Sequence, residues 1–311
     1  APEAPLYIMT VRCYYYINTL IIISSGRTDM DRFSKLIEKK GLAVLDGAMA
    51  TQLEARGCDI NDELWSAKML AEAPELIEAV HLDYFEAGAD IGTSASYQAT
   101  VPGFMKKGFS REASEALIKR SMELLISARD KYQKEHPEKE LLTAAAAVGP
   151  YGAYLADGSE YRGDYIVDRG AIEAFHRERM SLLTEAGADI LACETLPCLW
   201  EAEIILNVAK ELDAPCWFSF SCRDGAHISD GTPISECAKR LDGEDIVKAV
   251  GVNCTRPEYI SELIENIRSS CSKPVVVYPN RGEEYDPVRK IWLGAKNAKD
   301  FGAWTEEWYG R

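Results

Sequence analysis

Two carboxylates, a thiol and an amide stand where apolar runs of this sequence end. They are Asp46, Glu194, Cys254 and Asn253. A deprotonated thiol is a nucleophile and a metal ligand, and a buried carboxylate needs a partner for its charge. Polar groups that gather where buried strands stop are typical of a ligand pocket. If the fold brings these side chains together, we expect them to line a binding site.

Each candidate also has a purely structural alternative. Asp46 begins an Asp-Gly pair, which commonly forms a turn or caps the next helix. Tyr97 suits a core aromatic equally well, and Asn280 suits a turn. Glu194 argues more strongly for function, because a carboxylate that follows an apolar strand cannot be buried unpaired without a free-energy penalty. Cys254 alone makes no metal site, because zinc requires three or four protein ligands.

The apolar runs that lead to these residues predict strands. Most are continuously apolar rather than alternating, as expected for parallel strands that are covered on both faces. Seven of them occur, at 42–46, 89–96, 141–149, 189–194, 216–220, 247–253 and 274–278.

Helical patterns separate the strands. The segment 74–88 begins with proline, which is favoured in the first turn, and ends with glycine. The segment 111–135 predicts a longer helix. The hexapeptide EAGADI occurs twice, at 86–91 and 185–190, each time between a helix and the next strand. This placement indicates a repeated βα unit and a parallel sheet.

A (β/α)8 barrel of the TIM type is the predicted fold. Seven strands exceed a small doubly wound domain, and no Gly-rich dinucleotide fingerprint follows the first strand. Active residues of such barrels lie at the carboxyl ends of several strands. No eighth strand is evident before Arg311, so the barrel domain of residues 30–311 reads as truncated before that strand.

Composition excludes some classes of protein. The chain has 311 residues and a formal net charge of −15, which opposes binding to nucleic acid. Nine cysteines without any C-x-x-C pair indicate reduced thiols in a cytoplasmic protein.

The first 29 residues differ from the rest. The apolar run from Cys13 to Ile23 is shorter than the ~20 residues that span a bilayer. The run could also be the core of a signal peptide. We favour the interpretation of residues 1–29 as a non-native or mis-annotated extension and predict no membrane association. The sequence leaves a homo-oligomer open.

Seven segments together resemble one enzyme family. They are LDGAMATQLEARG, TSASYQAT, VGPYGAYLADGSEYRGDY, ACETLP, DGTP, GVNC and VVYPNRGEEYD. In this order they are similar to the homocysteine S-methyltransferases, especially the branch that uses S-methylmethionine or S-adenosylmethionine. Betaine–homocysteine methyltransferase is a more distant relative. The resemblance extends from about Met30 to Arg311.

The resemblance implies zinc-dependent methylation of a thiol. Zn²⁺ held by three cysteine thiolates would bind the homocysteine sulfur and keep it deprotonated, and that sulfur would attack the methyl carbon of a sulfonium donor to form methionine. The same resemblance assigns Cys254 to the metal, Asp46 and Glu194 to the homocysteine ammonium group, and Tyr97, Tyr151 and Asn253 to the lining of the site.

One element of the family pattern is absent. The other two zinc ligands are an adjacent cysteine pair at the end of strand eight, and this sequence contains no such pair. We therefore expect unpaired edges on the first and seventh strands. Two alternatives follow: a catalytically inactive homocysteine-binding or regulatory remnant, and substitute ligands drawn from Cys193, Cys222 and His227. A Schiff-base lyase is disfavoured, because no lysine stands at a predicted strand end.

Overall fold

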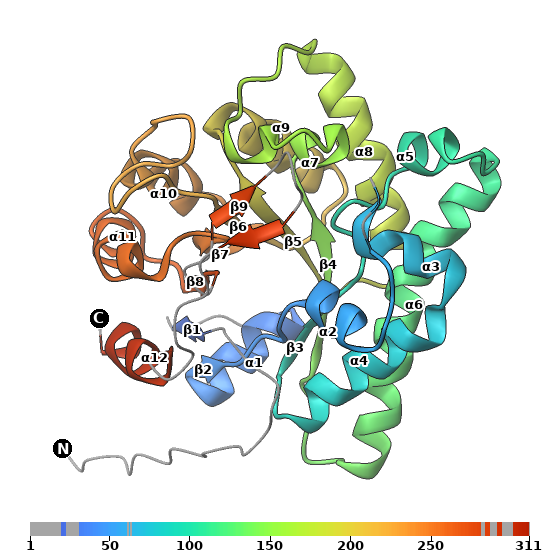
Figure 1. Cartoon of the computed structure of the whole chain (residues 1–311). Coiled ribbons are helices and arrows are strands. Elements are labelled where there is room, and N and C mark those ends of the chain that lie inside the picture. The colour runs from blue at the N-terminus through green and yellow to red at the C-terminus, as the bar shows by residue number, and fades with distance from the viewer. Residues whose placement is uncertain are drawn as a thin grey trace.

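The computed structural model describes residues 20–22, 31–60, 62, 64–280, 284–286, 291–293 and 301–310. Helices surround a curled sheet (Figure 1). The strands are β1 Leu20–Ile22, β2 Leu42–Ala43, β3 Ile91–Thr93, β4 Thr143–Val148, β5 Ile190–Leu196, β6 Cys216–Phe220, β7 Val247–Asn253, β8 Val275–Tyr278, β9 Glu284–Asp286 and β10 Ile291–Leu293.

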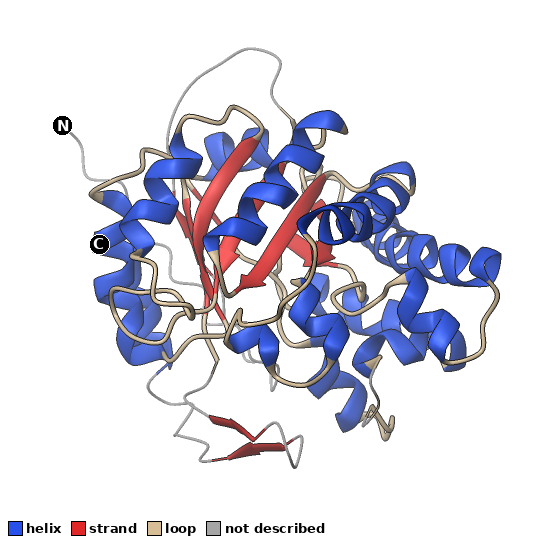
Figure 2. Cartoon of the chain, turned by 90° about the horizontal axis from the view of Figure 1, so that it is seen from above, coloured by secondary structure: helices blue, strands red, loops and turns tan. Residues whose placement is uncertain are grey.

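The α-helices cover the outside of the sheet, on both sides of it in the second view (Figure 2). They are α1 Arg32–Lys40, α2 Met49–Ala55, α3 Met69–Glu72, α4 Pro74–Glu86, α5 Val101–Lys106, α6 Arg111–Glu135, α7 Tyr151–Leu155, α8 Arg169–Glu185, α9 Leu199–Glu211, α10 Ile234–Asp242, α11 Ile260–Arg268 and α12 Phe301–Tyr309. Three short 3₁₀ helices are η1 Trp65–Lys68, η2 Ser159–Tyr161 and η3 Pro257–Tyr259.

All seven predicted strands form, and the predicted fold class is confirmed. The strands β3 to β8 pair in sequence order and in parallel, as βα units require. The segment after β2 joins β3 through a parallel bridge between Leu45 and Ile91. Among the described residues no eighth parallel strand follows β8. Strands β9 and β10, which the sequence did not predict, form a separate antiparallel pair (Figure 2).

The expectation of two unpaired edges is wrong. Strand β1 lies between β8 and β2 and pairs with both in antiparallel orientation. Ile21 stands opposite Val276 on one side and Ala43 on the other. The ring of strands is therefore closed by a segment of the N-terminal region. The other residues of the predicted 1–29 extension lie outside the described residues, and its non-native origin stays a prediction.

An apolar cluster fills the interior of the ring at its amino-terminal end. Helix α1 contributes Phe33, Leu36 and Ile37, all buried, and the strands contribute Trp217 and small residues around it. The rings of Phe33 and Trp217 lie 5.9 Å apart between centroids. This packing fixes α1 beneath the barrel and leaves the opposite end to polar side chains.

The repeated EAGADI segments explain how successive strands are held in register. Gly88 has a φ of +106° and Gly187 a φ of +94°, values that side chains other than glycine rarely adopt. In the first copy, the Asp90 carboxylate accepts a hydrogen bond from the Val44 amide at 3.1 Å and pairs with Lys40 at 2.6 Å. The aspartate thus joins its own strand to the preceding one.

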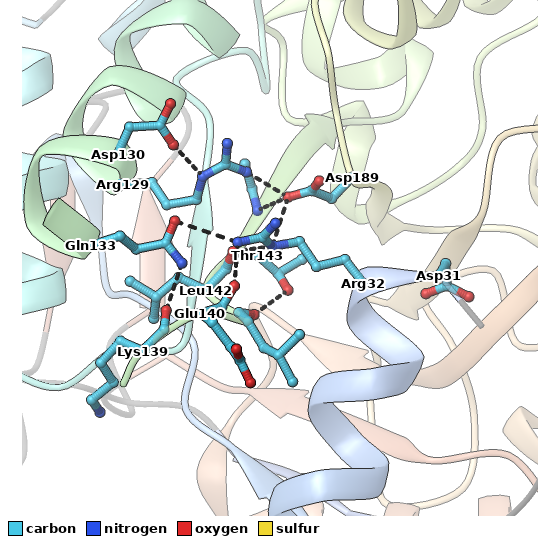
Figure 3. Close-up of polar contacts among 12 residues, drawn as sticks. Asp31, Arg32, Arg129, Asp130, Gln133, Lys139, Glu140, Leu142, Thr143 and Asp189 are labelled. Carbon is cyan, nitrogen blue, oxygen red and sulfur yellow. Dashed lines mark hydrogen bonds and ion pairs between the residues drawn. The ribbon is translucent and has the colours of Figure 1, made fainter. Parts of the chain in front are cut away.

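The second copy repeats this arrangement (Figure 3). The Asp189 carboxylate accepts a hydrogen bond from the Ala144 amide at 2.8 Å. It accepts another from Arg129 at 2.9 Å. Arg32 of α1 approaches the same carboxylate and donates to the Leu142 carbonyl at 2.6 Å. The interpretation of the repeat as a βα unit is confirmed.

No helix in the described part of the chain is both long and apolar enough to cross a membrane.

The backbone hydrogen bonds of strand β1 should stabilise the folded chain. We expect Ile21→Pro to lower the free energy of unfolding by about 3 kcal/mol, because proline removes a ladder donor from a strand paired on both sides. Thermal unfolding measures the effect, with Ile21→Val, which keeps the amide, as the control. Equal melting temperatures for the two variants would show that β1 does not close the barrel.

Candidate active site

The carboxyl ends of β5 and β7, with the segments that follow β2 and β3, bring most of the predicted residues together. The charge of Glu194 raises the pKa of both Asp46 and Cys254, so the three groups lie near one another. The charges of Cys254 and Glu194 contribute to the raised pKa of Tyr97. Asn253 is hydrogen-bonded to the neighbouring Cys254. The predicted convergence of strand ends therefore holds for these five residues.

Asp46 is held by the next strand of the barrel. Its carboxylate accepts hydrogen bonds from the Thr93 amide at 2.6 Å and the Thr93 hydroxyl at 3.0 Å. Burial raises the pKa of Asp46 from 3.8 to about 8, and the nearby charge of Glu194 adds to this rise. The hydrogen bonds from Thr93 lower the pKa only in part. At neutral pH this group therefore favours a proton or another positive charge beside it.

Glu194 ends its strand in a similar environment. Its carboxylate accepts a hydrogen bond at 2.9 Å from the Tyr278 hydroxyl, which also lies 2.5 Å from the Ser219 hydroxyl. Burial raises the pKa of Glu194 from 4.5 to about 7, against the opposing effects of Tyr278 and Arg179. Within the described residues neither Glu194 nor Asp46 forms a salt bridge. Together they can accept a cationic group such as an ammonium.

Asn253 clamps β5 to β7. Its side-chain oxygen accepts a hydrogen bond from the Thr195 amide at 2.8 Å, and its Nδ2 donates to the Thr195 hydroxyl at 2.7 Å. The same Nδ2 lies 3.4 Å from the Cys254 sulfur. Thr195 and Cys254 have φ values of +60° and +46°, a conformation that non-glycine residues adopt at a cost of roughly 1–3 kcal/mol. The clamp holds two strained residues beside one another at the centre of the site.

The Cys254 thiol is partly buried, and this environment favours its protonated form. Burial raises the pKa of Cys254 to about 11, and the charge of Glu194 contributes to the rise. Hydrogen bonds from Thr195, Tyr161 and Asn253 oppose it. A bare thiolate is therefore disfavoured at neutral pH, and a positive charge at the sulfur would be required to stabilise one.

The structure adds Tyr161 to the site and places Tyr151 elsewhere. Tyr161, in η2, hydrogen-bonds to the Cys254 sulfur, although it lies far from any predicted strand end. The Tyr151 ring instead packs on Tyr154, Tyr165 and Phe175, at centroid distances of 5.5, 5.8 and 5.0 Å. Only its position in the GSEY segment of the sequence could have singled out Tyr161.

A three-ligand metal site is not formed by the described residues. No group of three histidine, cysteine, aspartate or glutamate side chains there could hold an ion. Cys254, at the end of β7, is a thiol near the Glu194 carboxylate. The substitute ligands are not supported: His227 is bonded to Asp224 at 3.0 Å, and the Cys222 sulfur contacts the Phe220 carbonyl at 3.8 Å.

Comparison with known proteins identifies the relatives of this chain. A family model described as homocysteine S-methyltransferase matches residues 43–309. The chain is 49% identical over 284 residues to "Homocysteine S-methyltransferase YbgG" of Bacillus subtilis, covering 90% of both chains. It is 47% identical to "Selenocysteine Se-methyltransferase" of Brassica oleracea, covering 91% of this chain and 87% of the relative.

A solved structure agrees with these relatives. The metallated form of the homocysteine methyltransferase MmuM of Escherichia coli superposes with a TM-score of 0.77 at 46% identity. The match covers 86% of this chain and 87% of the other.

The raised pKa values of the two carboxylates predict a pH-dependent gain in stability on substitution. Folding keeps protons on Asp46 that the unfolded chain releases between about pH 4 and pH 8, so its contribution to stability falls as the pH rises through that window. We expect Asp46→Asn to be more stable than the wild type by about 2 kcal/mol at pH 7.5. The difference should disappear near pH 4.

Denaturant unfolding at pH 4, 6 and 7.5 measures this difference. The control is Glu185→Gln on α8, whose exposed carboxylate pairs with Lys119 at 2.8 Å. A constant difference between the Asp46 variant and the wild type at all three pH values would contradict the assignment of a buried, proton-holding carboxylate.

Proposed function

The chain belongs to the homocysteine S-methyltransferase family, and from this we propose that it transfers a methyl group from a sulfonium donor to the thiol of homocysteine, forming methionine. The donor is S-methylmethionine or S-adenosylmethionine. The observation that carries the proposal is the pair of buried carboxylates, Asp46 and Glu194, beside the thiol of Cys254.

The two carboxylates fit the amino group of the acceptor. Both are buried, and neither forms a salt bridge among the described residues, so an ammonium group would satisfy charge and hydrogen bonding at once. Because both have pKa values near or above neutrality, binding of the ammonium would release the protons that they hold. Asp46 and Glu194 are therefore proposed to bind and orient homocysteine.

The reaction needs little covalent participation by the protein. The acceptor sulfur forms a bond to the methyl carbon while the bond from that carbon to the donor sulfur breaks, and the donor leaves as a neutral thioether. The thiol proton goes to solvent or to a neighbouring base. Orientation of two sulfur atoms in line with the methyl carbon is the main task of the site. The Asn253–Thr195 clamp and the partly buried Tyr97 support such a role as lining residues.

Tyr151 is retained as a proposed substrate-binding residue with a modified role. Its ring belongs to an aromatic group beside the loop after β4, and its backbone amide donates to Glu201 at 2.6 Å. It supports the loop that carries Tyr161. Contact of its ring with a cationic donor would require the donor to extend along this loop.

Zn²⁺ is the proposed metal, and Cys254 is its proposed ligand in this chain. The metal, when bound, would supply the positive charge that keeps the acceptor sulfur deprotonated. The described residues form no group of three metal-binding side chains, whereas the family resemblance implies three thiolates. No step above therefore depends on the metal. The relatives are named as methyltransferases, which lends no support to an inactive remnant.

The proposed location is the cytoplasm. Eight cysteines of the described residues are free thiols, which supports a reducing compartment. Homocysteine and the sulfonium donor are the proposed partners, and nucleic acid is not among them.

Isotope transfer tests the reaction directly. Full-length protein supplied with zinc, homocysteine and S-methylmethionine carrying deuterated methyl groups should yield deuterated methionine from both substrates, measured by mass spectrometry. S-adenosylmethionine in a parallel reaction identifies the preferred donor. Absence of methylated homocysteine with both donors would reject the proposed function.

Steady-state kinetics test the proposed role of Glu194. Glu194→Gln should raise the KM for homocysteine at least tenfold, because the ammonium group of homocysteine loses a charged partner.

Metal analysis tests Cys254. We expect Cys254→Ala to reduce bound zinc per chain and to abolish methyl transfer, because a ligand thiolate is lost. The control is Cys271→Ala, since Cys271 is buried just before β8, at the opposite end of the barrel. Equal zinc content in both variants would remove Cys254 from the metal site.

A further inference from the structure

A third buried carboxylate lies beside the site, and the proposed reaction does not yet use it. Glu160 belongs to η2, in the loop after β4, and only 8% of the residue is exposed. The loop is closely packed there, since a Cβ at Gly152 would lie 2.5 Å from the Glu160 nitrogen. The Ser221 hydroxyl contacts the Glu160 carbonyl at 3.5 Å. The backbone of Glu160 is thus fixed against the end of β6.

The carboxylate of Glu160 is only partly satisfied. Backbone amides of its own loop, those of Gly158 and Glu160, hydrogen-bond to it. Its Oε2 atom is nevertheless buried without a hydrogen-bond partner among the described residues. A buried carboxylate oxygen without a donor carries a desolvation penalty that a cationic ligand would offset. Burial also raises the pKa of Glu160.

The neighbours of Glu160 include two tyrosines of the site, one of which contacts the Cys254 sulfur. Among the neighbouring charges, that of Glu160 raises the pKa of Tyr97 most, and it also raises the pKa of Tyr161. Tyr161 is hydrogen-bonded to the Cys254 sulfur. Glu160 therefore lies near two tyrosines, one of which is hydrogen-bonded to the proposed metal ligand Cys254, on a loop that contributes neither Asp46 nor Glu194.

The charges of the two substrates differ in a way that matches this third carboxylate. Homocysteine carries one ammonium group, for which Asp46 and Glu194 are proposed. An amino-acid sulfonium donor brings a second ammonium group, which needs hydrogen-bond acceptors of its own when Asp46 and Glu194 are engaged by homocysteine. An ammonium has three hydrogen-bond donors, whereas a sulfonium has none. An unpaired carboxylate oxygen is therefore suited to the ammonium rather than to the sulfonium.

We propose that Glu160 binds the α-ammonium group of the sulfonium methyl donor and so selects donors that carry an amino-acid end. This inference rests on the proposed function and names a residue that determines its donor specificity. S-methylmethionine and S-adenosylmethionine share this ammonium group, so Glu160 serves either donor.

Equilibrium binding tests the proposal without requiring turnover. Isothermal titration of the full chain with S-methylmethionine, in the absence of homocysteine, should show that Glu160→Gln weakens donor binding by tenfold or more. The dissociation constant for homocysteine, measured separately, should stay within twofold of the wild type. The control Asp164→Asn, an exposed carboxylate of the same loop that pairs with Arg162 at 3.1 Å, should leave both constants unchanged.

A sulfonium compound without an amino group distinguishes recognition of the ammonium from recognition of the sulfonium. Trimethylsulfonium competes for the same site but lacks an ammonium, so its binding should be equal in the wild type and in Glu160→Gln. A similar loss of affinity for trimethylsulfonium would show that Glu160 responds to the sulfonium, and it would overturn the proposal. Equal affinity of both proteins for S-methylmethionine would overturn it as well.

Folding is checked independently, because a structural role would predict a different result. Glu160→Gln removes an incompletely paired buried charge, so its melting temperature should equal or exceed that of the wild type. A marked fall in melting temperature together with weaker binding of homocysteine would assign Glu160 to loop structure instead. If the wild type binds neither sulfonium, the proposed function fails together with this inference, whereas a failure confined to the Glu160 variant leaves the proposed function intact.

Discussion

Closure of the strand ring is the constraint on which the site depends. Parallel strands present their polar carboxyl ends at one end of the barrel, but Asp46 meets Glu194 only if the sheet curls far enough to join its first and last members. In this chain β1 provides the joint by pairing with β8 and β2. Its antiparallel direction means that it closes the wall without adding a carboxyl end to the site. The eighth place in the ring of strands is thus filled by a strand that closes the wall, while the site residues come from the other strands and their loops.

Negative charge is the dominant feature of the site within that ring. Asp46, Glu194 and Glu160 are all buried, and the pKa of each is raised by that burial. Buried carboxylates with incomplete partners destabilise a folded chain, so their presence here is best explained by cationic ligands. The same charge raises the pKa of Cys254, which makes an unassisted thiolate still less favourable. A positively charged donor and a positively charged metal both relieve this repulsion.

Periodicity and strand-end position were enough to predict the fold and much of the site from sequence. Each apolar run became a strand, and Asp46, Glu194 and Asn253 met because parallel strands end on the same side. Pairing of β1 could not be predicted, because a three-residue strand between distant partners leaves no local pattern. Tyr161 was missed because η2 belongs to a long loop whose path depends on packing. Tyr151, three residues beyond β4, turns toward α8 for the same reason.

The path of that loop is fixed by one buried glutamate on a neighbouring helix. Glu201 of α9 accepts hydrogen bonds from the Tyr151 amide and the Tyr165 hydroxyl, and its carboxylate lies 2.9 Å from His176 Nε2. The loop between β4 and α8 is thereby attached near both of its ends. Because η2 lies between the two attachments, Glu160 is held in place without needing a partner for its own Oε2. A carboxylate whose position is secured by other groups remains available to a ligand, which is the arrangement that preorganised binding requires.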